Sequence, residues 1–293
     1  MSAAEGTEYR IQGATADHES VEAWSTSRLP FEPTKVTARP WLPQFRSRLR
    51  EEVKKLPAVP GEMLIVQFAT DETQLFDAEN VLLYNVGLDA FRRSGYDGVR
   101  FERRDWAWAP NGLDGAHCYH RYSFGPSESS AGGVALARWS GVPLDAFARD
   151  PSASLAWLAM RTAEVEVAAP VAIGSRFAVH MTLDVPAGSS ASAVQLLKPL
   201  LDGTISAFHD YVGEDLDRMS LRLAEVLREE QPRIRSLLVG AGVALLGPRR
   251  VIGGWGATTQ WNPADDLCTS GSLIVRRGDA PTWRLTGALT SIG

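Results

Sequence analysis

The sequence has few cysteines and no long apolar run. Its 293 residues include only two cysteines, Cys118 and Cys268, whose wide separation suggests no disulfide framework. The most apolar stretch, residues 237–246, is far shorter than the roughly 20 residues that a membrane-spanning helix needs. Residues 1–17 are polar and lack the apolar core of a secretory signal. These features predict a soluble protein of the cytoplasm.

Charge of one sign is also scarce. The formal net charge is −5, and no long run of acidic or basic residues interrupts the chain. This balance disfavours nucleic-acid binding driven by overall charge, although it leaves room for a local basic patch. Short arginine clusters such as Arg103–Arg104 are interpreted as solvated faces. We therefore expect the partner to be another protein or further copies of this chain, with no membrane involved.

No catalytic or cofactor motif is complete. The sequence contains no Gly-x-x-x-x-Gly-Lys-Ser/Thr loop, no Gly-x-Gly-x-x-Gly between a strand and a helix, and no Gly-x-Ser-x-Gly elbow. The glycines between residues 240 and 256 are better explained by turns and close packing. This absence favours a non-catalytic binding or assembly protein without a cofactor, and it leaves enzymatic activity open.

Hydrophobic periodicity predicts a mixture of helices and strands. The expected helices span residues 44–55, 77–93, 155–164, 193–211 and 216–227. The expected strands span residues 9–12, 35–39, 63–69, 98–103, 118–124, 134–139, 176–185, 273–277 and 282–289. Pro199 is expected to kink or interrupt its helix, and Gly278–Asp279 is expected to close a hairpin between the last two strands.

These elements indicate an α+β fold of two similar lobes, each a mainly antiparallel sheet backed by helices. A lead-in segment, residues 1–30, precedes an N-terminal lobe of residues 31–145 and a C-terminal lobe of residues 150–293. The order strand, loop, helix occurs at residues 63–91 and again at 177–208. Internal duplication would explain this recurrence, and so would chance, because the order is common.

An acidic loop provides the best candidate for a site. Asp71, Asp77 and Glu79 lie between a predicted strand and the following helix. Carboxylates clustered in this way can hold Mg²⁺ or Mn²⁺, because hard cations take oxygen ligands. The alternative is structural: Asp77 also fits a helix N-cap, and Asp71 fits a solvated loop.

The string Asp77-Ala78-Glu79-Asn80 resembles the Asp-x-Asp-Asn-x-x-Lys motif of RusA-type Holliday-junction resolvases. The resemblance implies a metal-dependent nuclease in which these acids bind the ion for phosphodiester hydrolysis. Leu83 stands where that motif has its lysine. In the second lobe, Lys198 and Asp202 resemble the missing lysine and later aspartate, whereas Ser192 and Val194 replace the paired acids there. A divergent nuclease is thus the alternative function.

Two histidine-containing strings have structural and functional interpretations. Cys118 and His120 point to the same face if they lie on a strand, but zinc needs further ligands that no nearby motif supplies. A buried cysteine is the simpler interpretation. His209 and Asp210 suggest half of an acid–base pair, or else a cation near a helix C-terminus.

Overall fold

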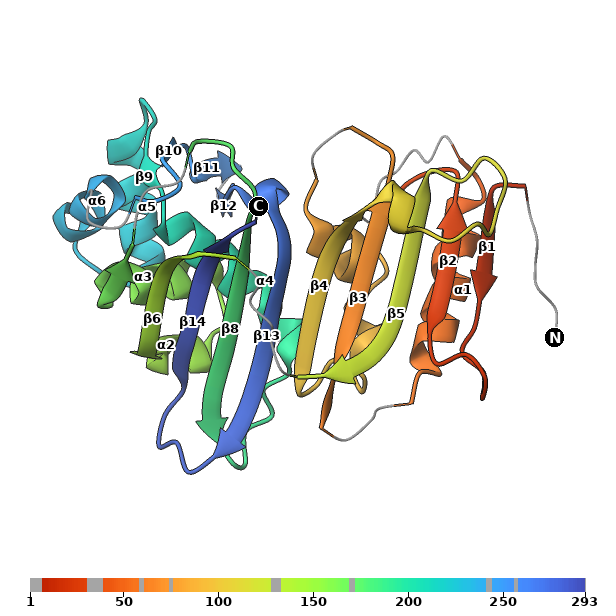
Figure 1. The fold of residues 1–293 in the computed structure, drawn as a ribbon. Helices are drawn as coiled ribbons and strands as arrows, with labels where there is room; N and C mark the ends of the chain where they lie inside the picture. The colour runs from red at the N-terminus through yellow and green to blue at the C-terminus, as the bar shows by residue number, and fades with distance from the viewer. Residues whose placement is uncertain are drawn as a thin grey trace. The chain divides into compact units, whose positions relative to one another are not determined.

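The computed structural model describes residues 7–30, 39–57, 61–73, 76–127, 133–168, 172–240, 244–255 and 258–292. The chain divides into two compact units (Figure 1). Unit 1 comprises Met1–Ser129, Ala191–Gln195 and Thr269–Val275, and unit 2 comprises Ser130–Ser190, Leu196–Cys268 and Arg276–Gly293. Helices account for 31% and strands for 34% of the structure, which confirms the α+β class. Most of the predicted strand 35–39 lies outside the described residues.

Unit 1 contains a mixed sheet with the strand order β1, β2, β5, β3, β4, β13. The strands are β1 (Tyr9–Gln12), β2 (Val21–Ser25), β3 (Glu62–Thr70), β4 (Gly98–Asp105), β5 (Cys118–Pro126) and β13 (Cys268–Gly278). Only β3 and β4 are parallel among the pairs described. Residues 270–274 of β13 pair with β4. The last strand of this sheet therefore comes from a distant part of the chain.

Helix α1 (Leu42–Lys54) covers one face of this sheet because its apolar residues recur at helical spacing. Phe45, Leu49 and Val53 are all buried. The ring of Phe45 lies 5.2 Å from Tyr9 of β1 and 6.1 Å from His120 of β5. In Figure 1, α1 lies behind β1 and β2. The predicted helix at residues 44–55 is confirmed.

Residues 77–93 do not form the single helix that their periodicity predicts. A π-helical segment, η1 (Asn80–Tyr84), and a 3-10 segment, η2 (Leu88–Phe91), replace it. Gly87 separates the two with φ 111°, a conformation that favours glycine. The helical prediction was therefore only partly right, because the chain turns at Gly87.

Two arginines of α1 explain this turn. The Nε of Arg46 donates a 2.8 Å hydrogen bond to the carbonyl oxygen of Asn85, and Arg50 donates to that of Val86. These guanidinium groups satisfy carbonyls that a continuing helix would otherwise satisfy with backbone amides. A Cβ on Gly87 would meet the Arg50 guanidinium at 2.5 Å, so a substitution there would also displace the end of the Arg50 side chain.

Unit 2 contains an antiparallel sheet of β8 (Phe177–Pro186), β14 (Arg284–Ser291), β6 (Ala135–Pro143) and β7 (Val165–Val167), in that order. Helices α2 (Asp145–Arg149), α3 (Ala153–Thr162) and α4 (Ala193–Ala207) lie behind its strands in Figure 1. The predicted hairpin of the last two strands was wrong, since β14 pairs with β8 and β6 while β13 pairs with β4.

The rest of unit 2 consists of two helices and two small two-stranded sheets. These elements are β9 (Asp210–Tyr211), α5 (Leu216–Leu227), α6 (Gln231–Val239), β10 (Pro248–Arg249), β11 (Ile252–Trp255) and β12 (Thr258–Trp261). Helix α4 continues through Pro199 and ends at Ala207, four residues before the predicted end. In the described parts of the chain, every helix is too short or too polar to cross a bilayer.

A strand followed by a helical segment occurs in both units, as β3 with η1 and as β8 with α4. The units differ in the strands that flank this pair. In unit 1, β3 lies between a parallel and an antiparallel neighbour, whereas β14 is an antiparallel neighbour of β8 in unit 2. Internal duplication stays a prediction.

Helix α5 ends at a residue that is left-handed without being glycine. Arg228 has φ 56°, and the amides of Arg228 and Glu229 donate to the carbonyls of Glu225 and Ala224, which forms a Schellman-type end. Replacing Arg228 by glycine should raise the free energy of unfolding by roughly 0.5–1 kcal/mol, because glycine adopts this conformation without a Cβ clash. Urea denaturation measures the change.

Glu225→Gly provides the matched control, since Glu225 is exposed and lies inside the same helix. This change should lower the free energy of unfolding by roughly 1 kcal/mol. A loss of stability in Arg228→Gly as well would show that the left-handed residue contributes no strain.

Candidate functional site

The acidic loop brings two of its predicted ligands together. Asp77 precedes η1, and its Oδ2 accepts a 2.5 Å hydrogen bond from the Nδ2 of Asn80. Glu79 is fully buried. One carboxylate oxygen of Asp77 and one of Glu79 lie within 4.8 Å of each other. Both therefore lie close enough to share one cation, given oxygen–metal distances of roughly 2.0–2.6 Å.

Asp71 has a different partner. Its Oδ2 lies 2.9 Å from the Nδ1 of His117, and both side chains are substantially exposed. Within the described ranges, no group of three or more potential metal ligands includes Asp71. Of the three predicted ligands, the structure thus groups Asp77 with Glu79 and places Asp71 at hydrogen-bond distance from His117.

Lys198 and Asp202 lie on α4 in the part assigned to unit 2. The Nζ of Lys198 is 3.1 Å from Asp202 and 3.4 Å from Asp265. The first contact is the i, i+4 pairing expected on a helix surface. The lysine therefore interacts with two carboxylates of its own unit, which supports a structural role for these predicted catalytic residues.

Cys118 and His120 lie on the side of β5 that faces α1, and both are buried. Burial raises the pKa of the Cys118 thiol to about 12 and lowers the pKa of His120 to about 3. Neither a thiolate nor an imidazolium therefore forms here near neutral pH. Among the described residues, no group of three potential metal ligands contains either one. The buried-cysteine interpretation agrees with this environment.

His209, just beyond the end of α4, contacts the main chain. Its Nδ1 lies 2.9 Å from the carbonyl oxygen of Gly247. Burial lowers the pKa of His209 to about 4, so the ring is neutral at physiological pH. A neutral histidine at this position does not act as a cation on the helix dipole, and its backbone contact supports a structural role.

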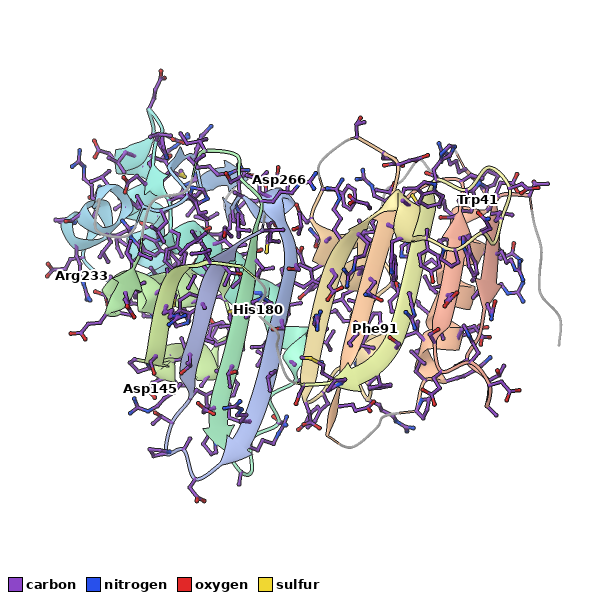
Figure 2. The ribbon with its side chains drawn as sticks, viewed as in Figure 1. Trp41, Phe91, Asp145, His180, Arg233 and Asp266 are labelled. Carbon is purple, nitrogen blue, oxygen red and sulfur yellow. The ribbon has the colours of Figure 1, made fainter. Side chains whose placement is uncertain are left out.

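The sheet of unit 1 carries a row of polar side chains on the face that points away from α1. The strand register places Glu22, Arg121, Gln67 and Glu102 opposite one another across β2, β5, β3 and β4. In Figure 1, no α-helix of this unit lies in front of these strands, and Figure 2 shows side chains standing on them. The segment that contains Trp106, Ala109, Leu113 and Ala116 packs over the part of this face around Trp24 and Tyr119. We call this surface the open face of unit 1.

Glu102 positions two arginines of the open face. It accepts a 3.0 Å hydrogen bond from the Nε2 of Gln67 and forms ion pairs with Arg100 and Arg104, which lie two residues to either side. Burial opposes ionisation of Glu102, but the Gln67 hydrogen bond and the two guanidinium charges outweigh it and lower the pKa of Glu102. The carboxylate therefore stays ionised and orients both guanidinium groups.

A second row of the open face consists of three aromatic rings between two guanidinium groups. The guanidinium of Arg10 lies 5.6 Å from the ring of Trp24, which lies 5.2 Å from Tyr119. Trp108, in the 3-10 turn η3 (Trp106–Trp108), is 5.4 Å from Tyr119 and 5.8 Å from the guanidinium of Arg104. Trp24 and Tyr119 are buried, whereas Trp108 is 36% exposed. Trp108, next to Arg104, is therefore the accessible ring of this row.

A depression borders the open face where residues 14–20 connect β1 with β2. Its volume is about 620 Å³, and Arg121 and Ser123 contribute to its lining. Polar side chains of the connection, including His18 and Ser20, line the opposite side. A surface with fixed arginines beside a depression of this size can accommodate polar groups of a partner.

Glu102→Gln should lower the free energy of unfolding by about 1–3 kcal/mol at pH 7, because two guanidinium groups lose their shared carboxylate. The lowered pKa of Glu102 means that its contribution exists above the unfolded-state value of 4.5 and disappears as pH falls through the folded-state value. Chemical denaturation at several pH values should therefore show the difference between variant and wild type shrinking in acid. A difference that is constant with pH would contradict this role.

One part of the open face has a recognisable sequence pattern, which by itself indicates only solvent-exposed residues. Arg100, Glu102 and Arg104 alternate along β4, which places them on one side of a strand. Their partners Gln67 and Arg121 come from other strands, and only the register reveals the shared row. Without that register, the arginines read as ordinary solvated residues.

No protein-family model matches the chain, and no curated protein or solved structure matches it either.

Proposed function

We propose that this chain is a non-catalytic binding protein of the cytoplasm, and that the open face of unit 1 engages another macromolecule. The observation that supports this is the organisation of Arg100 and Arg104 by the buried carboxylate of Glu102. A buried ion pair often stabilises a fold no more than apolar residues of the same volume would, although breaking the pair is destabilising. Fixed donors on a face that no α-helix of the unit covers suit recognition of a partner.

Site-specific photo-crosslinking tests the location of the binding surface. A benzoylphenylalanine residue would replace Ser123, which lies beside Arg121 on the open face. Its counterpart would replace Leu221 of α5, which is 48% exposed and belongs to unit 2. In cells that produce the protein, we expect a discrete crosslinked product from position 123 and none of the same size from position 221.

Arg121→Glu tests whether the crosslinked product depends on the charge of the open face. The charge reversal should remove the product formed from position 123 while leaving the fold intact, because the Arg121 side chain is 39% exposed. Equal crosslinking from both positions, or a product that survives Arg121→Glu, would refute the open face as the binding surface.

The second candidate function is a metal-dependent nuclease, favoured by the proximity of the Asp77 and Glu79 carboxylates. In this alternative, Mg²⁺ or Mn²⁺ binds between them and acts on a phosphodiester. A nuclease assay with each ion, comparing wild type with Asp77→Ala and with Asp71→Ala, tests it. Metal-dependent cleavage that Asp77→Ala abolishes and Asp71→Ala preserves would support the alternative, and equal activity of all three proteins would exclude it.

A further inference from the structure

The accessible charges of the open face are basic although the whole chain is acidic. The side chains of Arg104, Arg121 and Arg100 are 44%, 39% and 27% exposed. The acids that pair with them, Glu102 and Glu22, are only 7% and 12% exposed. A partner approaching the strands therefore meets guanidinium groups first, with the carboxylates beneath them. Charge complementarity selects an anionic partner.

The spacing of these arginines suits a chain of anions. Arg100 and Arg104 approach the carboxylate of Glu102 from either side, so their guanidinium groups lie close together on β4. Arg121 lies two strands away from them, across Gln67 of β3, at about 10 Å in the direction of the hydrogen bonds. A single small anion cannot contact all three guanidinium groups, whereas a polymer with repeated charges can.

The aromatic row distinguishes among anionic polymers. Trp108 offers an accessible indole within 5.8 Å of the Arg104 guanidinium, so a flat ligand can stack beside a bound anion. Single-stranded nucleic acids combine phosphates with unpaired bases, and proteins bind them with basic grooves that carry stacking aromatic side chains. A polyglutamate segment lacks the flat groups, and a duplex keeps its bases stacked inside.

We propose that the open face of unit 1 binds single-stranded nucleic acid, with phosphates on Arg100, Arg104 and Arg121 and a base stacked on Trp108. This proposal rests on the proposed binding function and specifies its ligand. Exposed acidic residues lie at both ends of the open face. Asp17 and Glu19 precede β2, and Asp105 is the last residue of β4. These acids repel phosphates and limit the bound segment to a few nucleotides.

Fluorescence anisotropy with a labelled oligodeoxythymidylate of about 12 nucleotides tests the proposal. Three phosphate contacts predict that the logarithm of the binding constant falls with the logarithm of the salt concentration with a slope of about −2. Affinity should therefore decrease roughly 15-fold between about 50 mM and about 200 mM NaCl. Arg104→Glu combined with Arg121→Glu should weaken binding at least about tenfold and flatten this slope.

Trp108→Ala separates stacking from charge. It should weaken binding by about 5- to 100-fold while leaving the salt slope unchanged. Arg233→Glu, on the exposed surface of α6, is the matched control and should bind like wild type; Arg233 is labelled in Figure 2. Circular dichroism melting of each variant shows whether it is folded, and Trp108→Ala tests a single exposed side chain if the double arginine variant unfolds.

The remaining outcomes each overturn a defined part of the proposal. Equal affinity for a polyglutamate peptide would assign the face to acidic proteins, and equal affinity for a duplex would exclude single-strand recognition. If position 123 still crosslinks but no oligonucleotide binds, the ligand assignment is wrong and the binding function stands. If crosslinking also fails, the binding function fails with it. Nuclease sensitivity of the crosslinked product would identify nucleic acid directly.

Discussion

Replacing Arg161 by methionine should lower the free energy of unfolding by about 3 kcal/mol, because one guanidinium group satisfies the ends of two helices. Arg161 donates to the carbonyl oxygen of Ala207 at 3.0 Å, where α4 ends, and to that of Gly240 at 2.7 Å, just after α6. Its Nε donates to Leu237 at 2.8 Å. Methionine keeps most of the aliphatic stem but leaves these carbonyls without their donor.

The positive charge contributes as well, since a cation at a helix C-terminus interacts favourably with the helix dipole. Arg161→Lys keeps this charge with fewer donors and should recover about a third of the loss. Guanidinium chloride denaturation measures all variants, with Arg233→Met as the control, because Arg233 is exposed and pairs with Glu229. A loss below about 1 kcal/mol in Arg161→Met would show that water replaces the donor at little cost.

His120→Phe should make unit 1 resistant to mild acid. The folded-state pKa of His120 is about 3, well below the unfolded value of about 6.5, because burial disfavours the imidazolium. Between pH 6.5 and 3, the unfolded chain therefore binds a proton at His120 and the folded chain does not. The free energy of unfolding is highest above pH 6.5 and falls as the pH decreases toward 3. Because of this single residue, the free energy of unfolding of the wild type should fall by about 2–3 kcal/mol between pH 7 and about pH 4.5.

Phenylalanine suits the site, because His120 already packs against the rings of Phe45 and Phe68 with centroids 6.1 and 4.8 Å away. Stability at pH 7 should change by less than about 1.5 kcal/mol, as for other swaps of similar volume. Phe68→Leu is the control, since it opens a cavity that destabilises equally at both pH values. If His120→Phe lost as much stability in acid as the wild type does, protonation of His120 would not be the cause of that loss.

His209 of unit 2 should retain its own acid sensitivity in the His120→Phe variant. Burial holds its pKa at about 4, so its contribution also disappears as pH falls below 6.5. Above about pH 4.5, the pH dependence of stability that remains in the variant therefore includes the contribution of His209, whereas the part that is lost reports on His120.

Elements with a local cause could be predicted from the sequence. Helix α5 was expected at residues 216–227 and spans Leu216–Leu227, because its apolar spacing alone determines the buried side. Strand β8 was expected at residues 176–185 and spans Phe177–Pro186, since Phe177, Val179 and Met181 alternate with more polar residues. In both cases the hydrophobic pattern agrees with the final packing.

Elements whose conformation depends on a distant part of the chain could not be predicted from the sequence. The break at Gly87 depends on Arg46 and Arg50, which reach the carbonyls from another helix. The hairpin at residues 273–289 failed because β14 pairs with β8 instead, a choice that no turn sequence encodes. The open face needs the register of four strands, so its residues could be found on strands but not assembled into a row.

The strand order of unit 1 also bears on how the chain folds during synthesis. Residues 270–274 pair with β4, whose residues 98–102 leave the ribosome much earlier. At about 5–20 residues per second, β4 waits on the order of ten seconds or more for its neighbour. During that interval the exposed edge of β4 can pair with other chains, which makes β4 a site of aggregation in the nascent protein.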